Sequence, residues 1–235
     1  MDERVYWIWL SEALHPGSRK IKEIYKSYKS AKEFYNMGQM EWRLFGMLTR
    51  KEINRLIDYD ISEAEEILNK CAFLGIDIIT LSDELYPQRL KEIDNPPGTL
   101  YIKGTMPRID DIVCIAIVGT RNATSYGVDM AFDLSYSLSK LGAIIVSGGA
   151  IGIDTAAHKG ALQAKGQTVL VMGCGLNYNY LPENLEMRRQ VKEQGVLMSE
   201  YPPDMPPIRS NFPMRNRIIS GLSSGTVVVE AGSRR

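Results

Sequence analysis

The sequence predicts an α/β protein: an extended Rossmann-like, mostly parallel and doubly wound sheet, preceded by a small all-helical domain. Two observations carry this prediction. From residue 112 onward, short apolar runs alternate with segments of helical period, which is the pattern of βαβ units. Before residue 76, amphipathic segments with capping residues indicate short helices. We therefore expect a helical domain at residues 1–75 and a Rossmann-like domain at residues 76–235.

The composition is that of an ordinary globular protein, with 44% hydrophobic and 24% charged residues. No apolar run approaches the ~20 residues that cross a bilayer, and residues 1–10 carry acids where a signal peptide needs bases. The cysteines are far apart without metal-ligand spacing, which indicates reduced thiols. We expect a cytoplasmic protein with no membrane segment. Because the formal net charge is zero, nucleic-acid binding would need a local cluster of cations.

The helical half shows a lysine-rich face and several helix ends. Residues 20–35 place their apolar side chains roughly on one face and predict one helix. For its lysines, a solvated surface is the favoured interpretation and contact with nucleic acid the alternative. Thr49 with Glu52 forms a capping box, and Ser62 has an acid at the same spacing, so we expect helices to begin at both places. Gly75 is a suitable helix stop.

The Rossmann-like half is divided by its apolar runs. Strands are expected at residues 76–81, 100–102, 112–118, 143–147, 168–172, 196–199 and 225–230. Helices are expected at residues 126–141, 155–164 and 185–194, with a short one around Arg217. The run at 112–118 is apolar throughout, as in a strand buried on both faces. In such a sheet, ligands bind outside the carboxyl ends of the strands, so the turns that follow them form the candidate site.

Glycine-rich turns follow the strands at 112–118 and 143–147. Gly119, Thr120 and Arg121 form the first turn, where the glycine admits a ligand and the arginine can hold a phosphate with two hydrogen bonds. The second turn, SGGAIGID at 147–154, is typical of an anion-binding nest at a helix N-terminus. Its candidate ligand-binding residues are Ser147, Gly148, Gly149 and Gly152. Asp154 is interpreted as a helix N-cap. His158, one turn later, either lines the site or packs in the core.

Two further segments complete the candidate site. The turn after residues 168–172 contributes Gly173 and Gly175, and Cys174 between them has no partner in the sequence that would make it a nucleophile. The proline-rich loop after residues 196–199 supplies three cations around an aromatic ring: Arg209, Phe212, Arg215, Asn216 and Arg217. Cations interleaved with an aromatic residue are typical of a polynucleotide site. A surface cluster of arginines is the alternative.

Cofactor motifs are missing from these turns. Neither glycine turn has the G-x-G-x-x-G dinucleotide fingerprint, and no acid is suitably placed for a ribose, which argues against NAD. No Gly-Lys-Ser/Thr sequence forms a P-loop. We therefore expect no cofactor, no metal ion and no catalytic residue, and the arginines direct the prediction toward a polynucleotide backbone.

Three motifs together resemble the DprA/Smf DNA-processing family. They are IVGTR at 117–121, SGGAIGID at 147–154 followed by an Ala-His pair, and the long, specific FPMRNRIISGL at 212–222. The resemblance covers roughly residues 76–230. The helical half is similar to the variable SAM-like or helix–hairpin–helix-like extension that many members carry.

The resemblance implies an extended Rossmann fold that binds single-stranded DNA without catalysis. Members protect incoming strands during natural transformation and load the RecA recombinase, usually as homodimers. By motif position, Arg121, the turn at 147–152 and residues 215–217 would line the DNA pocket. Lys159 would add a cation there.

The chain departs from the family pattern at two places. Ile151 stands where the family usually has an arginine, so one expected cation is missing. The chain ends at Arg235, where the family normally continues into further strands and sometimes a winged-helix domain. These later parts carry much of the family's dimer and RecA surface, so we expect an incomplete domain.

Two other functions remain open from the residues. A nucleotide hydrolase related to the phosphoribohydrolases would use Glu230, because Gly225 and Thr226 faintly resemble the signature of those enzymes. A nucleotide-sensing module would bind a mononucleotide in the same pocket.

Overall fold

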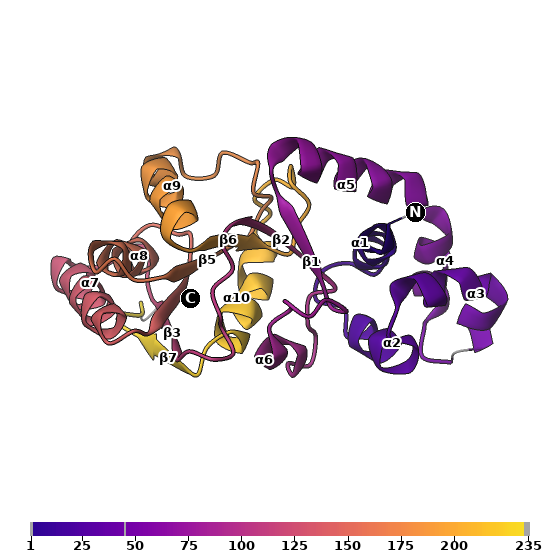
Figure 1. Ribbon diagram of the computed structural model, residues 1–235, viewed down its shortest axis with the longest axis horizontal. Helices are drawn as coiled ribbons and strands as arrows, with labels where there is room; N and C mark the ends of the chain where they lie inside the picture. The colour runs from indigo at the N-terminus through magenta and orange to yellow at the C-terminus, as the bar shows by residue number, and fades with distance from the viewer. Residues whose placement is uncertain (1, 45, 233–235) are drawn as a thin grey trace.

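The computed structural model describes residues 2–44 and 46–232, and within them the chain forms a seven-stranded sheet with helices on both faces (Figure 1). The strand order is β1-β2-β6-β5-β4-β3-β7. The strands are β1 (Asp77–Thr80), β2 (Thr99–Gly104), β3 (Cys114–Val118), β4 (Ile144–Gly148), β5 (Thr168–Met172), β6 (Val196–Ser199) and β7 (Gly225–Val228). The five strands from β6 to β7 are parallel, while β2 runs antiparallel to both of its neighbours, β6 and the edge strand β1. The predicted α/β class is confirmed.

The central strands are buried on both faces, so both faces need a helical cover. Helices α7 (Ser125–Lys140), α8 (Ile153–Gln163) and α9 (Leu185–Gln194) form one layer. On the other face, α10 (Asn211–Gly221) packs against β4 and β5, and its buried residues join one core with those of the N-terminal helices. The result is a doubly wound sheet, as the sequence predicts.

The order of the strands produces a switch point at β3. From β3 the chain moves outward through β4, β5 and β6, then returns through α10 to place β7 on the other side of β3. Connections that leave neighbouring strands in opposite directions open a crevice at their carboxyl ends. The turns that follow β3 and β4 both lie at this edge, which sets the position of the candidate site.

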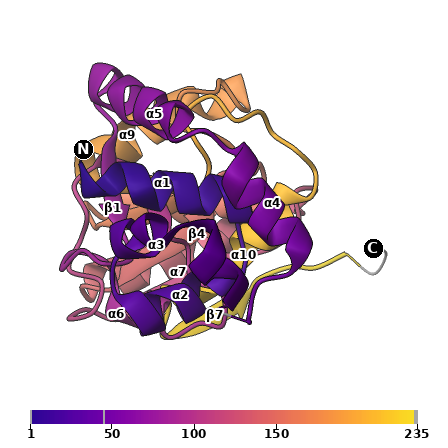
Figure 2. The same ribbon diagram turned by 90° about the vertical axis from the view of Figure 1, so that its right-hand side faces the viewer.

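The N-terminal region is a bundle built around α1. Its helices are α1 (Glu3–Leu14), α2 (Lys20–Tyr28), α3 (Ala31–Leu44), α4 (Arg50–Asp58) and α5 (Ile61–Leu74). In Figure 2, α1 lies between α5 on one side and α2 and α3 on the other. Trp7 and Trp9 of α1 are fully buried, and Trp9 contacts the rings of Phe34 and Trp42. A single hydrophobic core joins this bundle to β1, β2 and α10.

The predicted single helix at residues 20–35 is wrong, because the chain turns between α2 and α3. Lys29 adopts a left-handed conformation (φ 61°), and its N–H closes α2 on the carbonyl of Tyr25. Residues six apart point to different faces of a straight helix. The turn instead brings the rings of Tyr28 and Phe34 to a centroid distance of 5.5 Å and lets Phe34 stack on Trp42.

Two of the predicted helix ends are confirmed and one is wrong. Thr49 and Glu52 form the capping box of α4, and Gly75 ends α5 with φ 59°. However, α5 is capped by Asp60, whose carboxylate accepts the N–H of Ser62 at 2.9 Å. An aspartate is at least as good an N-cap as serine, and it lies two residues earlier.

Over the described residues, no helix has both the length and the apolarity to span a membrane.

Candidate nucleic-acid interface

The carboxyl ends of β3 and β4, the start of β7 and one side of α10 surround a cavity of about 840 Å³. Its lining residues are Val118, Gly119, Arg121, Ala150, Asp154, Arg209, Phe212, Pro213, Arg215, Asn216, Arg217, Ile219, Ser220 and Thr226. Four of these side chains are arginines, and the carboxylate among them is Asp154. The cavity therefore concentrates positive charge in a chain whose net charge is zero.

An exposed arginine and a ring meet at the mouth of the cavity. The guanidinium of Arg121 lies 5.3 Å from the centroid of the Phe212 ring, within the range of a cation–π contact. Phe212 also contacts the ring of Tyr180 at 5.4 Å. A Cβ at Gly173 would lie 2.8 Å from the Phe212 ring. Gly173 thus makes room for this ring instead of lining the cavity.

The two glycine turns dock onto each other at a glycine that cannot be replaced without strain. Gly152 has φ 82°, and a Cβ there would lie 2.5 Å from the carbonyl oxygen of Thr120 and 2.8 Å from that of Arg121. The N–H of Ile153 donates to the Thr120 carbonyl at 3.3 Å. Gly119 packs closely against Ile153 as well. The position of Arg121 is therefore set by the turn that precedes α8.

A buried cation lies at the back of the cavity. Arg215 is only 4% exposed and donates to the carbonyl of Val171 and to the side chain of Asn216. Gly148 carries no Cβ, which leaves room for this guanidinium and for the Asp154 carboxylate. Burial lowers the pKa of Arg215, and the nearby Asp154 opposes that change. Burial raises the pKa of Asp154, while the Arg215 charge opposes it.

The interpretation of Asp154 as the N-cap of α8 is wrong. Gly152 is the N-cap residue, and Asp154 lies in the first turn of the helix. Only a glycine fits the close approach between the two turns, so the helix begins there without a side-chain cap. The Asp154 side chain is thereby free to face Arg215 across the cavity wall.

His158 is a buried histidine behind the second glycine turn. Its Nε2 lies 2.9 Å from the Gly148 carbonyl, which can only accept, so Nε2 carries a proton. Its Nδ1 lies 2.8 Å from the hydroxyl of Thr168. Burial lowers its pKa to about 4, which keeps the ring neutral. Of the two alternatives that the sequence left open, the geometry favours the packed histidine that supports Gly148.

Several other predicted site residues lie away from the cavity lining. The Ser147 hydroxyl donates to the Ile117 carbonyl at 2.6 Å and joins β4 to β3. Gly149 is buried against Met172. Gly175 packs against the loop after β6, where its N–H donates to the Met205 carbonyl. Lys159 lies on a different groove, beside Arg189 of α9. Ile151 is 38% exposed and adds no charge.

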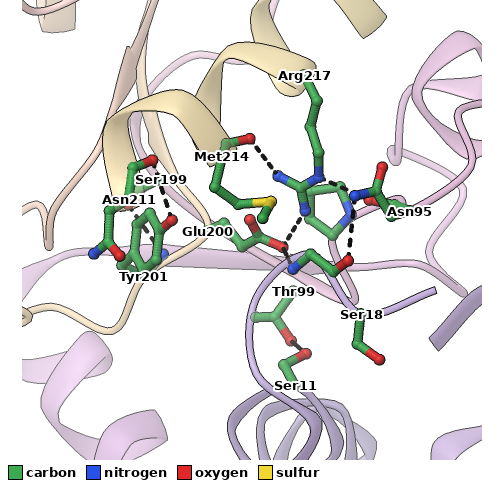
Figure 3. A network of polar contacts seen from close by, with 12 residues as sticks. Ser11, Ser18, Asn95, Thr99, Ser199, Glu200, Tyr201, Asn211, Met214 and Arg217 are labelled. Atoms are coloured by element: carbon green, nitrogen blue, oxygen red, sulfur yellow. Dashed lines mark hydrogen bonds and ion pairs between the residues drawn. The ribbon is translucent and has the colours of Figure 1, made fainter. Parts of the chain in front are cut away.

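Arg217 is held in place by the chain around it (Figure 3). Its guanidinium donates to the Glu200 carboxylate at 2.5 Å and to the Asn95 carbonyl at 3.0 Å. The same Glu200 oxygen accepts the N–H of Gly17, and the side chain of Asn95 donates to the Gly17 carbonyl. Glu200 is buried and Arg217 is largely covered, with side-chain exposures of 2% and 14%. One side of the cavity is therefore joined to the N-terminal bundle.

Sequence reasoning gave no role to three residues that shape the site: Tyr180, Asn95 and Glu200. The position of Glu200, directly after β6, is a signal that could have indicated it, because strand ends face the site. Tyr180 and Asn95 come from irregular segments, where spacing carries no information about side-chain direction.

Cys174 and Glu230, the two residues that the sequence offered as candidates for catalysis, are not among the residues that line the cavity. Burial raises the pKa of the Cys174 thiol to about 11, so it stays protonated. The Glu230 carboxylate accepts hydrogen bonds from the N–H and hydroxyl of Thr124 at 3.0 Å, beside the start of α7, instead of lining the cavity. Among residues 2–44 and 46–232, no three His, Cys, Asp or Glu side chains cluster as metal ligands would.

Fold and site together define a Rossmann-like protein with an arginine-lined cavity at the switch point of its sheet. Residues 77–235 match the sequence profile of DNA recombination-mediator protein A. The chain belongs to that family.

Relatives and solved structures agree with this membership. The chain is 43% identical over 156 residues to DNA processing protein DprA of Bacillus subtilis, covering 66% of this chain and 52% of the relative. It is 34% identical over 242 residues to protein Smf of Synechocystis, covering 98% and 59%. The chain thus spans little more than half the length of these relatives.

Two solved structures of DNA processing protein A resemble the fold. The Streptococcus pneumoniae structure superposes with a TM-score of 0.82 at 28% identity and covers 100% of this chain and 80% of its own. The Helicobacter pylori structure, described for its single-stranded DNA binding mode, superposes with a TM-score of 0.61 at 32% identity, covering 68% and 72%. The first of these also matches the N-terminal helices.

Proposed function

We propose that this protein binds single-stranded DNA in the cavity between the glycine turns and α10, and acts as a recombination mediator without catalysis. The observation that carries the proposal is the pairing of Arg121 with Phe212 at the cavity mouth. Single-stranded nucleic acid is held by cations along its backbone and by rings on which bases stack. A relative described for its single-stranded DNA binding mode supports this choice of ligand.

The arginines contribute to DNA binding in different ways, depending on how exposed each one is. Arg121 and Arg209 are exposed and can follow the phosphates of a flexible strand. Arg215 is buried and fixed, so it contributes a constant positive potential at the floor of the cavity. Phe212 offers a ring face at the same place. Contacts to phosphates and stacking on a ring do not distinguish one base from another, so we expect binding with little sequence preference.

The wider role follows from family membership and remains part of the proposal. The protein would receive single strands during DNA uptake in natural transformation, protect them, and deliver them to the RecA recombinase. The longer protein would act as a homodimer. These activities are those of whole proteins, and the chain spans little more than half the length of these curated relatives.

Fluorescence anisotropy with labelled oligo(dT) at several salt concentrations tests DNA binding. The logarithm of the binding constant should fall linearly with the logarithm of the salt concentration. Arg121→Ala should weaken binding and reduce that slope by about 0.7, the value expected for one phosphate contact on a single strand. Arg189→Ala, which removes an exposed arginine of α9, is the control. Salt-independent binding, or equal effects of the two variants, would reject the proposal.

A further inference from the structure

A second groove lies between α2 and the short helix α6 (Gln88–Lys91), outside the cavity already described. Its volume is about 440 Å³, and four lysines line it: Lys22, Lys26, Lys29 and Lys91. The lysines come from two elements far apart in the sequence, so they converge on one concave surface instead of radiating from one helix. The acidic residue among the lining side chains is Glu92.

None of the four lysines of the groove has a carboxylate partner within 4.0 Å in the part of the chain that the structure describes. By contrast, Lys20 of α2 pairs with Glu23 at 2.9 Å. Unpaired cations that gather around a concave surface repel one another, and a bound anion relieves that repulsion.

A tyrosine ring organises the groove. The ammonium of Lys29 lies 5.0 Å from the centroid of the Tyr25 ring, and that of Lys91 lies 5.8 Å from it. Lys91 is also 5.7 Å from the buried ring of Tyr86. Lys29 is the C-cap residue of α2, four positions after Tyr25, the spacing at which side chains are neighbours on a helix. A partly exposed ring between two cations combines the two features that bind a single strand.

The groove is separated from the DNA cavity by one short segment, residues 92–95. On one side, the ammonium of Lys22 donates to the carbonyls of Glu92 and Ile93 at 2.9 and 2.8 Å. On the other side, Arg217 of α10 donates to the Asn95 carbonyl at 3.0 Å. Figure 1 shows α6 between α10 and α2. A strand that leaves the cavity along α10 would cross this segment and reach the lysines.

We infer that the α2–α6 groove is a second contact site for the phosphates of the same single-stranded DNA, next to the cavity. This inference rests on the proposed function. It assigns the lysine-rich face of α2 to nucleic acid instead of to solvent alone. The footprint on a strand is then longer than the cavity by itself would occupy, and strands too short to span both sites gain nothing from the groove.

The test compares two oligo(dT) lengths, about six and about twenty nucleotides, with variants that keep the fold. The groove variant carries Lys26→Gln, Lys29→Gln and Lys91→Gln. Its control carries Lys51→Gln, Lys140→Gln and Lys192→Gln, three exposed lysines on other surfaces. We expect the groove variant to bind the long strand at least about tenfold more weakly at 0.1 M salt, with a salt slope lower by about 2. Its binding to the short strand should equal that of the control.

The outcomes separate this inference from the proposed function. If the groove variant and the control bind the long strand alike while Arg121→Ala binds it weakly, the inference fails and the DNA cavity stands. Equal weakening on both strand lengths also overturns it, because the effect is then not confined to an extended contact. If the unsubstituted protein binds neither strand, the proposed function itself fails.

A second measurement does not depend on the stability of any variant. A long oligo(dT) that carries 5-iododeoxyuridine at one end should, on irradiation, crosslink to Tyr25, and the crosslinked peptide can be identified by mass spectrometry. A strand that crosslinks to the peptide of Phe212 from internal positions but never to that of Tyr25 would contradict the groove.

Discussion

Two arginines of the cavity hold the same charge in opposite surroundings. Arg121 is exposed and rests on the Phe212 ring, whereas Arg215 is buried and bonded to the Val171 carbonyl. The exposed arginine has room to adapt to a phosphate, whereas the buried one cannot move without leaving the Val171 carbonyl without its donor. Substitution of Arg215 should therefore affect stability and binding together, which makes Arg121 the cleaner probe of DNA contact.

At the same scale, substitution of Phe212 tests base stacking separately from phosphate binding. Phe212→Leu removes the ring but no charge, so we expect weaker binding of oligo(dT) by about 1–3 kcal/mol, the range for one stacked base. The salt slope should stay unchanged, because no phosphate contact is lost. Anisotropy titrations at several salt concentrations give both quantities. Phe132→Leu, on α7 and outside the cavity, is the matched control, and a changed slope in Phe212→Leu would contradict the assignment of stacking.

The Glu12 carboxyl gives stability a pH dependence that can be predicted in sign. Its Oε1 atom is buried without a hydrogen-bond partner, and burial, with the neighbouring Glu200, raises its pKa from 4.5 to about 7. The folded state then binds a proton that the unfolded state has released between these two values. The free energy of unfolding from this group should fall as pH rises from about 4.5 to about 7, by at most about 3.5 kcal/mol, and then stay level.

Urea unfolding at pH 5 and pH 8 measures this effect as the difference between the unsubstituted protein and Glu12→Gln. The difference is needed because His158 acts in the opposite direction. Its lowered pKa of about 4 removes stability as pH falls below 6.5. Both proteins share His158, so its contribution cancels. A pH-independent difference between the two proteins would show that Glu12 does not hold its proton to neutral pH.

At the scale of elements, the sequence predicts best where a buried run meets a sharp boundary. The predicted bounds of β5, α9 and β6 agree with the structure, because each apolar or amphipathic run is closed by polar residues or a glycine. The helix around Arg217 is longer than predicted and spans eleven residues. The break between α2 and α3 could not be predicted, because its cause is the packing of Phe34 on Trp42 and not a local signal.

The candidate site, too, could be predicted only in part from the sequence. Strand-end turns predicted that Arg121, Arg215 and the second glycine turn would meet, and the cavity joins them. Strand order alone does not tell which way a side chain points within a turn. That is why Lys159 and Gly175 were expected at a surface that they do not line. Glu200, which accepts a hydrogen bond from Arg217, follows the end of β6. Gly17, which also donates to Glu200, comes from the N-terminal bundle.

The docking of the two glycine turns can be tested at Gly152. Gly152→Ala places a Cβ against the carbonyls of Thr120 and Arg121 in a backbone region that non-glycine residues rarely adopt. We expect a loss of at least about 1–2 kcal/mol in the free energy of unfolding from the backbone strain alone, and weaker DNA binding because Arg121 moves. Urea unfolding and anisotropy measure both. Gly142→Ala, which also has positive φ but open space around it, isolates the strain, and equal DNA binding by the two variants would reject the docking role.

At the scale of the whole molecule, one hydrophobic core and the hydrogen bonds of Gly17 with Glu200 and Asn95 unite the bundle with the sheet. All three tryptophans, Trp7, Trp9 and Trp42, lie in the bundle. Tryptophan fluorescence therefore reports on the bundle, and circular dichroism on the whole chain. The division into domains at residue 75 stays a prediction, but the shared core leads us to expect one cooperative transition with coincident curves.

Glu200→Ala should shift both curves together. The substitution leaves the largely covered Arg217 guanidinium without its carboxylate and removes the acceptor of the Gly17 N–H, so we expect a loss of about 3–5 kcal/mol. Glu186→Ala, which breaks an exposed pair on α9, should change stability by less than about 1 kcal/mol. Two separate transitions, with only the dichroism curve shifted, would show that the bundle and the sheet unfold independently.

The contact between Gly17 and Glu200 also has a consequence for biosynthesis. The two residues are 183 positions apart, so a ribosome that adds ~5–20 residues per second completes the second about ten to forty seconds after the first. At the end of that interval α10, which follows Glu200 in the chain, has still not been made, so the core that it shares with the bundle is incomplete. The first part of the chain to emerge is thus among the last to complete its packing.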